Sequence, residues 1–192
     1  MEKLIVASNN KGKIAEIKAI LSDLYDVRSL KEENIVSDPE ETGATFAENA
    51  LIKAKAAHEL TGAATLADDS GLIVDALGGA PGVQSARYSG KHGNDKANNK
   101  LLLKNLDGIS DRTARFACAV ALVKADGEVI EAEGYTEGEI LYAEKGEGGF
   151  GYDPLFYSYD LEKSFGLASS EEKNSVSHRA RALKALEKKV RA

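Results

Sequence analysis

Paired carboxylates are the groups in this sequence that could hold a metal ion or accept a proton. Asp68-Asp69 directly follows the apolar run 64–67 and precedes Ser70-Gly71, and a second pair, Glu40-Glu41, precedes Gly43. Carboxylate oxygens are the ligands that Mg²⁺ prefers, and acids that converge need a cation to offset their repulsion. The pairs therefore favour a Mg²⁺ site if their segments meet. A solvated acidic loop is the alternative for Glu40-Glu41.

A basic loop near the N-terminus is a candidate for binding phosphate. The loop is Ser8-Asn9-Asn10-Lys11-Gly12-Lys13, and it lies between a predicted strand and the start of a predicted helix. Free amide groups and the helix dipole favour an anion at such a place. The loop is not a Walker A motif, because its leading glycine is absent and Ile14 follows Lys13 where Ser or Thr would bind magnesium. A capped helix with solvated lysines is the alternative.

Two further clusters lie in the C-terminal part of the chain. The segment 148–154 combines glycines, which let backbone approach a ligand, with Phe150 and Tyr152, which can stack on a planar base. Lys173 and Ser177-His178-Arg179 place cations near a predicted helix start, where the helix dipole opposes them unless an anionic or carbonyl-bearing ligand is present. A glycine-rich turn with a core Phe and a solvated basic surface are the alternatives.

Composition limits the class of protein. The chain of 192 residues is 43% hydrophobic and 29% charged, which is typical of a folded globular protein. Its net charge of −6 argues against general nucleic-acid binding. Cys118 is the only cysteine and has apolar neighbours, so we expect a buried thiol and no intrachain disulfide. The apolar run at residues 4–7 is too short for a signal peptide or a membrane span, so we expect no membrane partner and a cytoplasmic location.

Strands and helices alternate in the first half of the predicted fold. We predict a strand at 4–7, an amphipathic helix at 11–21 and a helix at 46–60, whose start is marked by a capping box of Thr45 and Glu48. A strand at 64–67 is expected to be interrupted at 68–71 and to resume at 72–74, which would put Asp68-Asp69 at a strand end.

The second half predicts a helix, a hairpin and a final helix. The helix covers 94–106, the hairpin strands cover 112–124 and 128–136 around Ala125-Asp126-Gly127, and the last helix covers 177–190. Together these elements indicate one domain over residues 1–192, an α/β fold with a mixed central sheet flanked by helices.

Taken in order, the motifs resemble those of the inosine/xanthosine triphosphate pyrophosphatase family over nearly the whole chain. The matching stretches are Ser8 to Lys13, Thr45-Phe46-Ala47-Glu48-Asn49-Ala50, Ala67 to Leu72, Pro81-Gly82-Val83 with Ser85-Ala86-Arg87-Tyr88, Gly148 to Phe156, and Ser177-His178-Arg179. The resemblance implies an elongated mixed sheet with two lobes around a substrate cleft, and a homodimer. Gln84 departs from the pattern, because many relatives carry a bulky residue there.

The resemblance also implies a reaction and a role for each motif. The reaction is Mg²⁺-dependent hydrolysis of ITP, dITP and XTP to the monophosphate and diphosphate. Asp69 would accept the proton of the attacking water, Lys13 would neutralise phosphate, and Glu40 or Glu41 would join Asp69 in holding the metal. The implied substrate contacts are Ser8, Asn9, Asn10, Lys11, Gly12, Lys13, Lys53, Ser70, Phe150, Gly151, Tyr152, Asp153, Lys173, His178 and Arg179.

Base selectivity is expected to come from hydrogen bonding. Hypoxanthine and xanthine offer an oxygen at position six where adenine offers an amino group, so donors of His178 or Arg179 would be left unpaired by ATP. Two other functions stay open. One is a related pyrophosphatase of the Maf type acting on pyrimidine nucleotides, and the other is a nucleotide sensor without catalysis, against which Asp69, Lys13 and the paired acids argue.

Overall fold

The computed structural model describes residues 1–192, which divide into two compact units. Unit 1 contains Met1–Asp69, Cys118–Gly134 and Arg179–Ala192. Unit 2 contains Ser70–Ala117 and Tyr135–His178. The expectation of a single domain over the whole chain stays a prediction.

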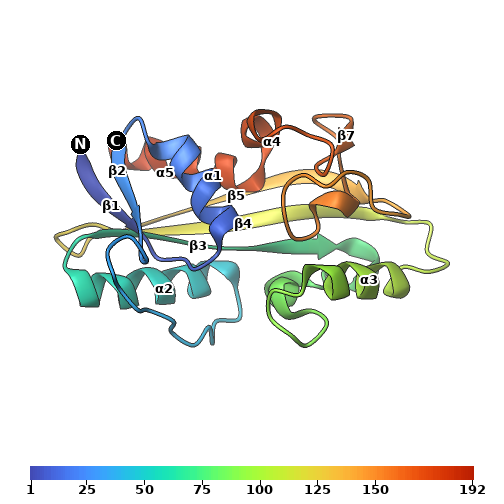
Figure 1. Cartoon of the computed structure of the whole chain (residues 1–192), viewed down its shortest axis with the longest axis horizontal. Helices are drawn as coiled ribbons and strands as arrows, with labels where there is room; N and C mark the ends of the chain where they lie inside the picture. Colours follow the sequence, from blue (N-terminus) through green and yellow to red (C-terminus); the bar gives the residue numbers. More distant parts are fainter. The chain divides into compact units, whose positions relative to one another are not determined.

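One mixed sheet of seven strands, in the order β2-β1-β3-β4-β5-β6-β7, forms the framework (Figure 1). The strands are β1 (Glu2–Val6), β2 (Tyr25–Ser29), β3 (Ala64–Val74), β4 (Thr113–Val123), β5 (Val129–Ile140), β6 (Phe156–Ser158) and β7 (Lys163–Ser164). Strand β1 pairs in parallel with β2 and β3, whereas β6 pairs antiparallel with β5 and β7. The predicted mixed α/β sheet flanked by helices is confirmed.

Helices cover both faces of the sheet in unit 1 (Figure 1). Helices α1 (Lys11–Leu21) and α5 (His178–Arg191) lie on one face and α2 (Phe46–Thr61) lies on the other. Successive strand side chains point to opposite faces, so the apolar run in β1 serves both layers. Leu4 and Val6 join the core under α1 and α5, whereas Ile5 packs in the core under α2.

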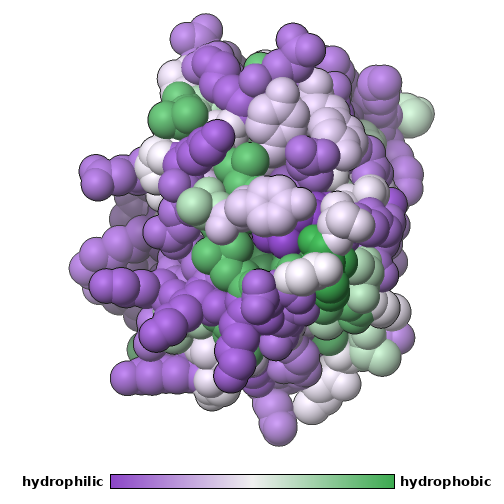
Figure 2. Space-filling view, turned by 90° about the vertical axis from the view of Figure 1, so that its right-hand side faces the viewer, coloured by the Kyte–Doolittle hydropathy of each residue, from purple (hydrophilic) through white to green (hydrophobic).

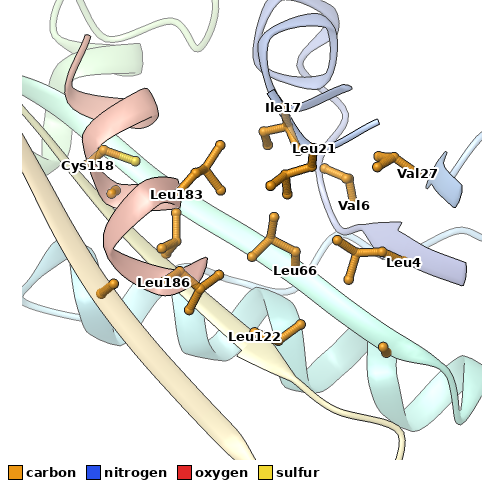
Figure 3. Close-up of a cluster of buried hydrophobic side chains, with 14 residues drawn as sticks. Leu4, Val6, Ile17, Leu21, Val27, Leu66, Cys118, Leu122, Leu183 and Leu186 are labelled. Atoms are coloured by element: carbon orange, nitrogen blue, oxygen red, sulfur yellow. The ribbon is translucent and has the colours of Figure 1, made fainter. Parts of the chain in front are cut away.

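The larger core of unit 1 consists of aliphatic side chains from α1, α5 and the sheet (Figure 3). Its buried members include Leu4, Val6, Ile17, Leu66, Cys118, Val120, Leu183 and Leu186. Burial of such side chains contributes about 1.5–3 kcal/mol each. The predicted buried position of Cys118 is confirmed.

Aromatic side chains form the centre of the unit 2 core. The ring centroid of Phe156 lies 4.5 Å from that of Phe116 and 5.1 Å from that of Phe165. The helices of this unit are α3 (Asp95–Asn105) and α4 (Ser170–Val176), with short 3₁₀ turns η1 (Asp75–Leu77), η2 (Gly82–Arg87) and η3 (Asp153–Leu155). The face of the molecule in Figure 2 is mainly hydrophilic, with hydrophobic atoms gathered near its middle.

The four helix predictions are confirmed, and the starts of α1 and α2 are marked by side-chain caps. Asn10 and Thr45 cap α1 and α2 with their side-chain oxygens. The Glu48 carboxylate accepts the N–H of Ala44 at 2.7 Å, one residue before the cap that the capping box predicted. No helix is both long and apolar enough to cross a membrane.

Two strand predictions are wrong in their limits. Strand β3 runs without interruption through Asp68 and Asp69, because each buried acid has polar partners on its own face and the ladder need not break. Strand β5 extends four residues past the predicted end at Thr136, with exposed and buried residues still alternating to Ile140. Strands β2, β6 and β7 and helix α4 had no sequence prediction.

Candidate active site

The loop after β1 is ordered by its own polar side chains. Asn10 Oδ1 accepts the N–H of Lys13 at 3.1 Å, and Ser8 Oγ accepts the N–H of Asn10 at 3.1 Å. Asn9 Nδ2 donates to the Ser37 carbonyl at 3.5 Å, while Lys11 is exposed. The loop therefore presents the first turn of α1 to solvent, the environment that favours an anion.

Asp68 is a fully buried carboxylate held among cations in unit 1. Its Oδ2 accepts hydrogen bonds from Nε and Nη2 of Arg179, both at 3.1 Å, and lies 3.4 Å from Lys13 Nζ. The Arg179 guanidinium also contacts the Glu16 carboxylate. Burial alone would raise the pKa of Asp68, but the charges of Lys13, Arg179 and Lys53 outweigh it and the pKa is lowered. Asp68 therefore stays ionised and fixes the Lys13 ammonium.

Asp69, the next residue of β3, points to the α2 side of the sheet. Asn49 Nδ2 donates to its Oδ2 at 3.2 Å, and Lys53 Nζ lies 3.9 Å from its Oδ1. Burial raises the pKa of Asp69 and the charge of Glu41 adds to this, although Lys53, Lys13 and the Asn49 hydrogen bond oppose it. A carboxylate with a raised pKa is a better proton acceptor than an ordinary aspartate.

Lys53 joins the two acidic segments. Its Nζ lies 2.9 Å from Glu41 Oε1 and donates to the Asp68 carbonyl oxygen at 2.6 Å. Burial would lower the pKa of Lys53, but the neighbouring acids raise it, so the ammonium stays charged. The structure thus brings Glu41 to Asp69, whereas the Glu40 side chain is exposed and makes no ion pair with this cluster.

Asn49 is a site residue that the sequence interpretation missed. It is buried, and its Oδ1 accepts the N–H of Gly43 at 2.7 Å while its amide binds Asp69. A Cβ on Gly43 would lie 2.6 Å from that oxygen, which explains the glycine. Asn49 therefore ties the Glu41 segment to Asp69. An asparagine on the buried face of a helix, beside Ala50, is the signal that could have revealed it.

The acids of unit 1 fit Mg²⁺ only with further oxygen ligands. No group of three or more His, Cys, Asp or Glu side chains in the protein is arranged to hold a metal ion by itself. Mg²⁺ is commonly held through one or two carboxylates plus waters and substrate phosphates. Glu41 and Asp69, both next to the Lys53 ammonium, match that donor set.

Unit 2 contains the glycine-rich loop, which is held by a buried ion pair. Asp153 Oδ2 accepts the N–H of Phe150 at 3.0 Å and pairs with Lys173 Nζ at 2.6 Å. The same Nζ lies 4.6 Å from the centroid of the Phe150 ring. Gly149 has a φ of +69°, and a Cβ there would overlap the Asp153 carboxylate. The loop conformation therefore requires glycine at this position.

Other predicted substrate residues have mainly structural surroundings. Tyr152 is in the core of unit 2 and its Oη donates to the Ser85 carbonyl at 2.7 Å. The buried His178 ring stacks on Phe116 with centroids 4.8 Å apart. Ser70 follows Asp69 in β3 and is partly buried. Base recognition by these residues and by Arg179 stays a prediction.

Fold and geometry together define a class of protein. Residues Lys13, Glu41, Lys53 and Asp69 form one connected cluster, at a place where β3 continues beyond the carboxyl end of its parallel neighbour β1. Open α/β sheets bind their ligands outside the carboxyl ends of such strands. The cluster combines the ammonium groups of Lys13 and Lys53 with the Asp69 carboxylate, a proton acceptor. It is therefore suited to binding a polyanion and to activating water.

Comparison with known proteins gives the family. The Ham1 family model matches residues 4–189, and the chain belongs to the Ham1 family. It is 52% identical to the dITP/XTP pyrophosphatase of Desulforamulus reducens over 185 residues, covering 95% of this chain and 92% of that protein. Among solved structures, the Staphylococcus aureus Ham1 protein has a TM-score of 0.87 at 42% identity, covering 99% of this chain and 98% of the other. A Coxiella burnetii HAM1 protein has a TM-score of 0.88 at 41% identity, covering 100% and 99%.

Proposed function

We propose that this protein hydrolyses the non-standard purine nucleoside triphosphates dITP, XTP and ITP to the monophosphate and diphosphate. The observation that carries the proposal is Asp69, a buried carboxylate flanked by Asn49 and Lys53 and tied through Asn49 to the segment of Glu41. The similarity to dITP/XTP pyrophosphatases over nearly the full chain supports the choice of substrate.

The mechanism follows from charge. A triphosphate repels nucleophiles, and the Lys13 and Lys53 ammonium groups would offset its charge. Asp69 would orient a water molecule and accept its proton as the water oxygen bonds to the α-phosphorus. The bond between phosphorus and the bridging oxygen of the α-β anhydride breaks, and diphosphate leaves with the electron pair. Asn49 would keep the Asp69 carboxylate in place for this step.

Glu41 and Asp69 would hold Mg²⁺, which when bound with the nucleotide supplies further neutralisation of phosphate charge. Glu41 is favoured over Glu40 because only Glu41 pairs with Lys53. The exposed Glu40 thus provides a matched control. We expect Glu41→Gln to weaken the Mg²⁺ dependence of activity and Glu40→Gln to leave it unchanged.

The loop 148–153 would recognise the base in this scheme. Phe150 offers an aromatic ring, and the neighbouring Lys173 and Asp153 fix the loop that carries it. His178 and Arg179 remain the proposed donors to the oxygen at position six. If Arg179→Ala reduced kcat/KM equally for ITP and ATP, Arg179 would not read the base.

One assay tests the function directly. The pure protein is incubated with a panel of purine and pyrimidine nucleoside triphosphates, with and without Mg²⁺, and the products are separated. Monophosphate plus diphosphate from ITP, dITP and XTP is the expected result. Preferential cleavage of pyrimidine nucleotides would favour a Maf-type activity. Nucleotide binding without product would favour a sensor.

A cytoplasmic location and a homodimer complete the proposal, and only the homodimer rests on the family resemblance. Fractionation of cells producing the protein tests the first. Light scattering on the purified protein tests the second, with the mass of one 20.5 kDa chain as the contradicting result.

A further inference from the structure

Both backbone groups of Gly151 are bound by side chains of helix α3. The Gly151 N–H donates to Asp95 Oδ2 at 2.9 Å, and the Gly151 carbonyl accepts from Asn99 Nδ2 at 3.1 Å. Asp95 and Asn99 are four residues apart and so share one face of the helix. One helix face therefore fixes the orientation of this residue.

The orientation of the Asn99 amide is determined by its surroundings. Asn99 is buried, and its Nδ2 also donates to Glu144 Oε1 at 3.1 Å, while its Oδ1 has no hydrogen-bond partner. A rotated amide would place the oxygen against two acceptors. The two acceptors therefore fix the Asn99 amide in the orientation that donates to Gly151.

Gly151 lies between two residues with separate anchors. On one side, the N–H of Phe150 is held by Asp153, and on the other, Tyr152 is held through its Oη by Ser85. Gly151 has a φ of +60° and no atom within 4 Å of a built Cβ, so the glycine serves backbone conformation alone. Without the hydrogen bonds of Asp95 and Asn99, the backbone at Gly151 could rotate and change the orientation of the Phe150 ring.

We propose that Asp95 and Asn99 are positioning residues that set the affinity for the nucleoside base by fixing Gly151 and with it the Phe150 ring. The proposal rests on the proposed function, in which the loop 148–153 contacts the base. Neither side chain needs to touch the substrate, since each acts through the Gly151 backbone. The ligand is a purine nucleotide, and these two residues would affect the binding of its base rather than of its phosphates.

Steady-state kinetics of the whole protein with ITP tests the roles of Asp95 and Asn99. We expect Asn99→Ala and Asp95→Ala to raise KM about tenfold, as for one lost hydrogen bond, with kcat within about twofold of the unchanged protein. Asp95→Asn keeps an oxygen that can accept the Gly151 N–H, so it should restore KM to near the original value. Asn105→Ala is the matched control, because this amide lies on the same helix and binds only the Tyr88 Oη.

Two competitive inhibitors separate the base from the phosphates. The inhibition constant of IMP should rise about tenfold in Asn99→Ala and Asp95→Ala, and that of inorganic tripolyphosphate should not change. Equal weakening of both inhibitors, or an unchanged KM for ITP, would overturn the proposal. If Asn99→Ala does not fold, the Asp95→Asn and Asp95→Ala pair decides. Wild-type protein that cleaves no nucleoside triphosphate would instead refute the proposed function, and with it the roles proposed for Asp95 and Asn99.

Discussion

The two units stabilise their polar residues by different means. In unit 1, ionised side chains balance one another around β3, with Asp68 against Arg179 and Lys13, and Asp69 against Lys53. In unit 2, one buried ion pair, Lys173 with Asp153, acts together with side-chain hydrogen bonds to the backbone amides and carbonyls of the glycine-rich loop.

This difference indicates which property each unit can control. Balanced charges determine which side chains are ionised and where the negative charge of a phosphate can be offset. Both properties affect the rate of a reaction at phosphorus. Hydrogen bonds to backbone determine the shape of a surface, which in the proposed function selects the base. We therefore expect changes in unit 1 to alter kcat or stability, and changes in unit 2 to alter KM.

The largest expected effect is on catalysis in unit 1. Asp69→Asn keeps the size of the side chain but removes the proton acceptor, so kcat for ITP should fall by about 10²- to 10⁴-fold. Thermal unfolding should change little, because burial raises the pKa of Asp69 and the charge is not favoured there. A kcat within threefold of the original would show that another group accepts the proton.

The next largest effect is on stability. Arg179→Ala leaves the buried Asp68 carboxylate and the partly buried Glu16 carboxylate without their guanidinium, and loss of one partner of a buried ion pair costs about 3–5 kcal/mol. Urea unfolding measures this cost. Arg191→Ala, in the same helix, removes an exposed pair with Glu187 and should cost at most about 1 kcal/mol. Equal costs would mean that the charges around Asp68 are not coupled as described.

A smaller effect is expected in the loop of unit 2. Gly149→Ala adds a Cβ that overlaps the Asp153 carboxylate, on a backbone whose left-handed conformation costs about 1–2 kcal/mol for a residue with a Cβ. Gly151→Ala has the same kind of φ but free space. Unfolding free energies should fall more for Gly149→Ala, and its KM for ITP should rise. The reverse order would contradict the role of Asp153 in shaping the loop.

The smallest expected effect concerns solvent access to the buried Cys118 thiol, which lies beside Asp68. Burial, together with the Asp68 charge, raises the pKa of the Cys118 thiol well above its usual range, although Arg179 and Lys13 oppose this. Only the thiolate reacts quickly, so at pH 8 the folded protein should take up almost no iodoacetamide. Mass spectrometry measures the modification, and urea-unfolded protein is the positive control. Rapid labelling of folded protein would show that solvent reaches this layer.

Local signals made much of the fold predictable. Asn10 and Thr45 each mark a helix start by a hydrogen bond within a few residues, so α1 begins where the sequence predicted and α2 likewise. Strand β2 was missed because it is short and its exposed residues, Asp26 and Arg28, pair with each other as a surface turn could.

The site was predictable in its residue types but not in its partners. Lys13, Lys53 and Asp69 were recognised from motifs. The roles of Asn49 and Asp68 depend on which segments meet after folding, and no local pattern encodes that. A polar side chain in a predicted helix is expected to be exposed until its buried partner is known. Asn99, which is buried, is an example.

The uninterrupted course of β3 has a consequence for sequence length. Asp68 and Asp69 face opposite layers only because neighbouring residues of a strand alternate. Inserting or deleting one residue between Ala64 and Asp68 would turn each carboxylate to the opposite face of the sheet, away from its present partners, whereas a change of the same size in the turn 124–128 would leave them in place. We therefore expect β3 to tolerate such length changes much less well than the turn 124–128.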